Sequence, residues 1–293
     1  MIAIDLGSNT IRLIEFDGCQ WGKSFEKIVK TAESLHQSGQ IGASAVQRII
    51  DAIDEAKGVI DFSSGEIVAY TTAAMRLATN SQEVLETIYE KSGVRFNVID
   101  AQTEGRLTLN AVLYRLKMLG NSFDPFVLCD IGGGSTELIR YAQGEIETLS
   151  IDQGIVTLSE SAYDKDGVFV KIDEFKASIA RQMGESSYGS LVMTAGTPTT
   201  IVAYLLGMDY LTYDPTKING YRLSLNDCIC VYDQLLSMDE SERTRFVGVG
   251  RENLIIAGIL MVIAVYEVMG VEEAIVVDDG LREGIALEYY KMK

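Results

Sequence analysis

The sequence contains little of the chemistry that metalloproteins and disulfide-bonded proteins use. Histidine occurs once, at His36, and proline three times in 293 residues. The four cysteines, Cys19, Cys129, Cys228 and Cys230, form no C-x-x-C pair. A zinc site or a disulfide framework is therefore not expected, and free thiols fit a reducing cytoplasm. We interpret His36 and the cysteines as structural residues.

Basic residues are also scarce relative to acidic ones. The chain has 25 Lys and Arg against 42 Asp and Glu, which gives a formal net charge of −17. Such a charge repels nucleic acids and anionic membrane surfaces, and no basic patch in the sequence interrupts it. We expect neither DNA nor a membrane as a partner.

Long apolar runs and export signals are missing as well. The most membrane-like stretch, "LIIAGILMVIAVY" at 254–266, is shorter than the roughly 18 apolar residues that a bilayer span needs, so we predict a buried helix. The first residues enter a strand without a basic segment or a cleavage site, and no export signal is expected. The length and the 47% hydrophobic content are typical of a globular protein with two lobes.

What the chain does contain is a glycine triplet directly after an aspartate. In "VLCDIGGGSTELI", residues 127–139, a buried strand runs through Asp130 into Gly132, Gly133 and Gly134. Glycine weakens an ordinary strand, because its backbone loses more entropy on folding and it has no side chain to pack. The triplet therefore indicates that another group approaches the backbone closely.

The same pattern occurs 125 residues earlier, in "IAIDLGSNTIRLI". Each copy is typical of a hairpin whose turn exposes backbone N–H groups, and such groups form a concave nest for an anion, usually phosphate. Two tight hairpins without a ligand are the alternative. The duplication favours phosphate binding and two similarly built lobes. The matched positions are Asp5 with Asp130, Gly7 with Gly132, and Thr10 with Ser135.

Hydrophobic periodicity predicts an alternation of strands and helices along the whole chain. In the first half, a helix opens with Asn80 as its cap and ends at Gly93, and a later helix carries Glu104 in its first turn. In the second half, the turn "AGTPTT" leads to a helix from about Thr199. Further helices are predicted at about 226–237, 241–247 and 252–269, before a last strand, "EEAIVVDD", and a helix, "GLREGIALEYY".

Six motifs occur in order over nearly the whole chain: "DLGSNT", "TTAAMRLATN", "EGRL", "DIGGGSTEL", "AGTPTT" and "DDGLREG". This set resembles the Ppx/GppA exopolyphosphatase and guanosine pentaphosphate phosphohydrolase family. The resemblance implies an α/β fold of the actin-like, sugar-kinase and Hsp70-like superfamily, in which two ribonuclease-H-like lobes face each other across a phosphate-binding cleft. We expect an N-terminal lobe at 1–120 and a C-terminal lobe at 121–293, with a terminal helix at 281–293 that can pack back on the first lobe.

The resemblance also implies which residues bind phosphate. Arg76 matches the family arginine that contacts phosphate oxygens through charge-assisted hydrogen bonds. A surface arginine that caps the preceding segment is the alternative for this position. The two glycine-containing loops would bind phosphate through Ser8, Asn9, Gly133, Gly134 and Ser135.

The acidic residues of the motifs match metal and water positions of the family. Asp130 and Glu137 match acids associated with Mg²⁺ or Mn²⁺, hard cations suited to carboxylate oxygens, and Asp5 is a further candidate ligand. Glu104 matches the carboxylate proposed as general base for the attacking water. The alternatives are a solvent-facing strand residue for Glu137 and, for Glu104, an acid that complements the helix dipole.

Departures from the family pattern bear on substrate and rate. Where the family usually carries a run of acids, this chain has "AQTEG", so Glu104 stands alone. The chain also stops at Lys293, before the helical C-terminal domains of longer members. The implied activity is metal-dependent hydrolysis of terminal phosphoanhydride bonds in polyphosphate or guanosine pentaphosphate, with a preference for short chains. A low-turnover phosphate or nucleotide sensor and a kinase or ATPase are the alternatives, and the oligomeric state stays open between monomer and homodimer.

Overall fold

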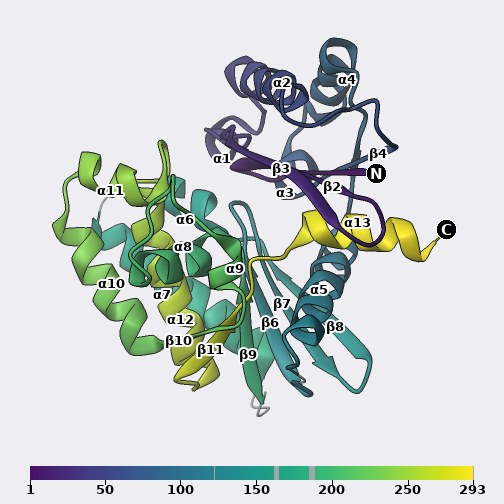
Figure 1. The fold of residues 1–293 in the computed structure, drawn as a ribbon. Helices are drawn as coiled ribbons and strands as arrows, with labels where there is room; N and C mark the ends of the chain where they lie inside the picture. The colour runs from purple at the N-terminus through teal and green to yellow at the C-terminus, as the bar shows by residue number, and fades with distance from the viewer. Residues whose placement is uncertain (122, 162–164, 185–188, 293) are drawn as a thin grey trace. The chain divides into compact units, whose positions relative to one another are not determined.

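The computed structural model describes residues 1–121, 123–161, 165–184 and 189–292 (Figure 1). The chain divides into two compact units. Unit 1 comprises Met1–Ala111 and Gly280–Lys293, and unit 2 comprises Val112–Asp279. The division falls inside helix α5 (Ala101–Met118) rather than at 120/121, and the last residues group with unit 1, in agreement with the expectation that the terminal helix can pack back on the first lobe.

Unit 1 contains a five-stranded sheet in the order β3-β2-β1-β4-β5. Strands β1 to β3 form an antiparallel meander, whereas β4 pairs in parallel with β1, and β5 in parallel with β4. The strands are β1 (Ile2–Leu6), β2 (Thr10–Phe16), β3 (Trp21–Ile28), β4 (Ile67–Thr71) and β5 (Phe96–Val98). The helices are α1 (Leu35–Ser38), α2 (Ala43–Lys57), α3 (Ala73–Leu77), α4 (Ser81–Ser92), the first part of α5, and α13 (Leu281–Lys291).

Helix α13 supplies part of the core of unit 1. Its residues Leu281, Ile285 and Ala286 share a buried cluster with Ala3 and Ile14 from the first two strands. In Figure 1 the yellow helix α13 lies against the purple strands of this unit. Burial of apolar surface is the main favourable term in such packing, so the C-terminal helix belongs to unit 1 for an energetic reason.

Unit 2 contains a six-stranded sheet in the order β10-β11-β9-β6-β7-β8. The three strands that come first in the chain, β6, β7 and β8, again form an antiparallel meander. The next strand in the chain, β9, pairs in parallel with β6. This repetition confirms the expectation of two similarly built lobes. The strands are β6 (Phe126–Ile131), β7 (Thr136–Ala142), β8 (Glu145–Ile151), β9 (Ser190–Thr194), β10 (Tyr221–Ser224) and β11 (Glu273–Val276). The helices are α6 (Ile155–Ser161), α7 (Lys165–Met183), α8 (Gly196–Leu205), α9 (Pro215–Ile218), α10 (Leu225–Ser237), α11 (Glu240–Val247) and α12 (Leu254–Met269).

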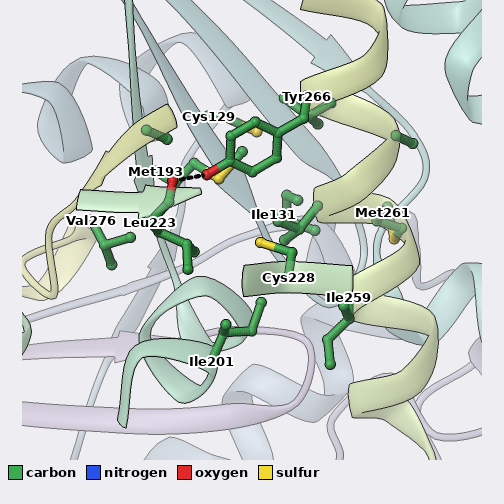
Figure 2. Close-up of a cluster of buried hydrophobic side chains, with 14 of the residues drawn as sticks. Cys129, Ile131, Met193, Ile201, Leu223, Cys228, Ile259, Met261, Tyr266 and Val276 are labelled. Carbon is green, nitrogen blue, oxygen red and sulfur yellow. Dashed lines mark hydrogen bonds between the residues drawn. The ribbon is translucent and has the colours of Figure 1, made fainter. Parts of the chain in front are cut away.

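The predicted buried helix is α12, which is apolar on nearly all sides and lies in the core of unit 2. Figure 2 shows this core, in which the Tyr266 hydroxyl donates a hydrogen bond of 2.6 Å to the backbone oxygen of Leu223. Cys129 and Cys228 are packed in the same cluster. Burial raises the pKa of Cys228 to about 12 and that of Cys129 further, so both stay protonated thiols. None of the described helices is long and apolar enough to cross a membrane.

One predicted helix cap and one predicted helix start are wrong. Asn80 precedes α4 but does not cap it, because its side-chain amide instead donates to the Ile41 oxygen and accepts from the Ile41 nitrogen, both at 3.0 Å. Helix α8 begins at Gly196 rather than near Thr199, since Ala195 turns the chain at a positive φ of 75° directly after β9. The predicted end of α4 is confirmed, with Gly93 in the left-handed conformation at φ 77°.

Removing the Tyr266 hydroxyl is expected to destabilise unit 2. In Tyr266→Phe the Leu223 backbone oxygen loses its side-chain donor, and the loss of a hydrogen bond costs about 0.5–1.5 kcal/mol. The shift of the urea unfolding midpoint measures this cost. Tyr204→Phe is the matched control, because its hydroxyl bonds the exposed Gln234 side chain, and its change should stay within about 0.5 kcal/mol. Equal effects of the two variants would contradict the assignment.

Candidate functional site

The hairpin of β6 and β7 places two carboxylates side by side in unit 2. Asp130 pairs directly with Glu137 in the antiparallel register, so both side chains lie on the same face of the sheet. Glu137 is only 1% exposed, and one of its oxygens accepts hydrogen bonds from the hydroxyls of Ser135 at 2.8 Å and Ser150 at 3.0 Å. A solvent-facing role for Glu137 is thereby excluded.

The carbonyl groups of the glycine turn in this hairpin are satisfied by the start of α6. Ile155 donates its backbone N–H to Gly132 at 3.0 Å, and Val156 donates to Gly133 at 2.8 Å. The approach is so close that a Cβ at Gly154 would lie 2.5 Å from the Gly133 carbonyl carbon. Glycine at this position therefore allows α6 to hold the turn from one side.

The amide groups of the same turn are not used in this way. Within the described parts of the chain, the N–H groups of Gly133 and Gly134 donate no hydrogen bond. Adjacent N–H groups of this kind attract an anion. The turn thus has the carbonyls of Gly132 and Gly133 satisfied and the amides of Gly133 and Gly134 available.

The equivalent turn in unit 1 is supported by the segment that follows β3. The backbone oxygen of Asn9 accepts hydrogen bonds from the backbone N–H groups of Val29 and Lys30, both at 2.9 Å. The backbone oxygen of Ser8 accepts from the backbone N–H of Ala32 at 2.8 Å. Ser8 is 5% exposed. As in unit 2, the carbonyl side of the turn is held by a neighbouring segment.

The two hairpins differ in the charge that lies opposite the aspartate. Asp5 pairs in register with Arg12, at the position where Asp130 has Glu137. Arg12 also forms an ion pair with Glu26 at 3.2 Å. A guanidinium near a carboxylate competes with a metal ion for it, so the unit 2 hairpin is the better cation site. Asp5 as a ligand stays a prediction.

Arg76 and Glu104 are brought together in unit 1 although 28 residues separate them in the chain. The Arg76 guanidinium contacts Glu104 at 2.8 Å and also donates to the Ile99 oxygen at 2.8 Å. The two side chains are 23% and 12% exposed. Arg76 therefore orients Glu104, a contact that motif reading missed when it assigned Arg76 to phosphate alone.

Glu104 is in the first turn of α5, as predicted, and that turn is fixed by Asp100. The Asp100 carboxylate accepts from the Thr103 backbone N–H at 2.7 Å, and hydrogen bonds from Thr103 lower the pKa of Asp100. Sequence reasoning did not single out Asp100. The signal that could have found it is an aspartate directly before the first helical turn, where a side-chain oxygen can cap the helix.

The donor set of unit 2 fits a hard divalent cation. Asp130 and Glu137 offer carboxylate oxygens, and Mg²⁺ is usually held by one or two carboxylates plus waters and substrate phosphates. In the part of the chain that the structure describes, no cluster of three or more His, Cys, Asp or Glu side chains could form a metal centre. A metal here would therefore depend on water and phosphate for its remaining ligands.

An α/β unit built twice, each copy with a glycine-containing turn and one with paired carboxylates, agrees with the duplicated α/β fold expected from the motifs. The model of the Ppx/GppA phosphatase family matches residues 23–292, and the chain therefore belongs to this family. The family and the fold class expected from the motifs are both confirmed.

Proteins similar over almost the full chain support this placement. Exopolyphosphatase 1 of Mycobacterium leprae is 28% identical over 302 residues, which cover 97% of this chain and 87% of that protein. Exopolyphosphatase 2 of Mycobacterium tuberculosis is 25% identical, with 97% of each chain covered. The structure of the Aquifex aeolicus PPX-GPPA enzyme is 28% identical, covers 98% of both chains and superposes with a TM-score of 0.78.

Proposed function

We propose that this chain hydrolyses terminal phosphoanhydride bonds of polyphosphate or guanosine pentaphosphate in a reaction that depends on Mg²⁺ or Mn²⁺. Membership of the Ppx/GppA family and similarity to exopolyphosphatases support a phosphoanhydride hydrolase. The observation that carries the finer proposal is the Asp130 and Glu137 pair beside a turn with available amides. A cation neutralises the carboxylates, and an anion binds the amides, so a metal-bound phosphate satisfies both.

The proposal assigns a role to each group. Asp130 and Glu137 hold the metal, which when bound neutralises charge on the phosphate oxygens. Ser135 fixes the Glu137 carboxylate by its hydroxyl at 2.8 Å. The turn amides of Gly133 and Gly134 bind phosphate. In unit 1, Ser8 and Asn9 are proposed phosphate contacts, Asp5 is a further proposed metal ligand, and Arg76 is proposed to contact phosphate as well as Glu104.

Glu104 is the proposed general base for the attacking water. Its carboxylate is 12% exposed and is held on a helix by Arg76, so it can keep one orientation toward a water molecule. A low-turnover sensor would not require an oriented carboxylate. The pair with Arg76 therefore favours hydrolysis over sensing.

The cysteines support a proposal about the cellular compartment. All four cysteines are free thiols, two of them exposed. Exposed thiols persist in reducing surroundings, which supports our proposal of a cytoplasmic protein.

Loss of a proposed metal ligand should weaken metal binding and slow the reaction together. Asp130→Asn removes one of two anionic ligands, and we expect weaker Mg²⁺ affinity and slower phosphate release from polyphosphate. Asp173→Asn, an exposed position on α7, is the control and should behave as the unmodified protein. Full activity of the unmodified protein in excess chelator would contradict the metal assignment.

Replacement of the proposed base should slow turnover and spare binding. General base catalysis contributes about 10² to 10⁴ in rate, so kcat of Glu104→Gln should fall by that factor while KM changes little. Glu83→Gln is a matched control, because Glu83 is also an acid in the first turn of a helix. If Glu104→Gln stays within about threefold of the control, Glu104 serves only the helix dipole.

Short substrates should be preferred. Each phosphate outside the binding turns carries negative charge over a protein of net charge −17, and this repulsion is screened only beyond about 8 Å at physiological salt. We expect kcat/KM for tripolyphosphate or guanosine pentaphosphate to exceed that for long polyphosphate, with a difference that shrinks at high salt. Efficiency that rises steadily with chain length at low salt would reveal a basic track and overturn this expectation.

A further inference from the structure

Helices α5 and α13 touch through their backbones in unit 1. A Cβ built at Gly284 would lie 2.5 Å from the carbonyl carbon of Leu107 and closer still to its oxygen, whereas ordinary van der Waals contact begins at 3.4 Å. Only glycine permits this approach. Because the contact is with backbone atoms, no side-chain rotation on α5 can relieve a larger residue at 284.

A second contact fixes the same two helices one turn further along α13. Arg106 on α5 forms an ion pair of 2.8 Å with Glu288. The start of α13 is itself held by Glu283, which is 5% exposed and accepts from the backbone N–H of Gly280 at 3.0 Å. Helix α13 is in turn anchored on the sheet of unit 1 by Leu281 and Ile285. The helix therefore provides a fixed surface against which α5 rests.

Leu107 lies one helical turn after Glu104 on α5. A displacement of the backbone at Leu107 is carried to Glu104, because the hydrogen-bonded turn between them moves as one piece. Glu104 must at the same time keep its 2.8 Å contact with Arg76, which comes from a different helix. The position of the carboxylate thus depends on where α13 places α5.

We propose that Gly284 is a positioning residue for Glu104, and that α13 sets the place of the carboxylate by close backbone contact with α5. This inference rests on the proposed function, in which Glu104 activates water. A side chain at 284 displaces α5 by about 1 Å, and a misplacement of that size can cost about 10²-fold in rate. Substrate binding by the glycine-containing turns does not depend on this contact.

The test is a double-mutant cycle on kcat. Gly284→Ala should lower kcat for tripolyphosphate hydrolysis about 10²-fold with KM within about twofold of the unmodified chain. In the Glu104→Gln background, the same substitution should change kcat by less than about twofold, since the group that it misplaces no longer acts. Ala286→Gly is the control, because it weakens the same helix without pushing α5, and its kcat should stay near that of the unmodified chain.

The outcomes separate this inference from the function on which it rests. If Glu104→Gln keeps full activity, the base assignment fails. If Glu104→Gln loses activity but Gly284→Ala retains it, or lowers kcat equally in both backgrounds, the positioning role of Gly284 is wrong. A rise in KM without a fall in kcat would also overturn it.

A second variant keeps the test decisive if Gly284→Ala does not fold. Glu288→Gln removes the ion pair with Arg106 and leaves the glycine contact, so a smaller fall in kcat, about threefold, is expected with unchanged KM. This loss too should vanish in the Glu104→Gln background. A kcat for Glu288→Gln equal to that of the unmodified chain would then contradict the proposal.

Discussion

The antiparallel register of two hairpins determines where the charged groups of the candidate site lie. Asp130 is opposite Glu137 on β6 and β7, and Asp5 is opposite Arg12 on β1 and β2. A slip of one residue would turn these side chains to the other face of the sheet. The residues next to these charged positions, Cys129, Leu138 and Ile4, point to the opposite face and are fully buried, so a slip would bring charged groups into the apolar core.

In unit 2 the register extends the carboxylate pair into a polar row across four strands. Ser150 on β8 pairs with Glu137, and Thr194 on β9 pairs with Asp130. The Thr194 hydroxyl donates to the backbone oxygen of Asp279 at 2.9 Å, just after β11. Residues from distant parts of the sequence thus meet on one edge of the sheet. In unit 1 the same row has Arg12 in place of the second carboxylate, so duplication preserved the scaffold and changed its charge.

The sequence was sufficient for features that local pattern or ordered motifs determine. The repeated hairpin, the buried α12 and the first-turn position of Glu104 are examples. The sequence was insufficient where a contact between residues distant in the chain determines the partner of a side chain. Asn80 matched a capping pattern, but its side chain forms hydrogen bonds with the backbone of Ile41 instead. The contact between Arg76 and Glu104 depends on how two helices pack in unit 1, and the spacing of residues in the sequence does not give this packing. The boundary between the units likewise falls inside α5, a position that the sequence pattern did not indicate.

The place of Cys129 has a consequence for which metals the carboxylates can attract. Cys129 directly precedes Asp130 on β6, and because successive side chains of a strand point to opposite faces, its sulfur lies in the apolar core instead of beside the carboxylates. Burial and the neighbouring acids Asp130 and Glu137 raise the pKa of this thiol, so it does not form the thiolate that soft metals bind. A metal held by the carboxylate pair as proposed would therefore gain no sulfur ligand from Cys129, its nearest cysteine in the sequence.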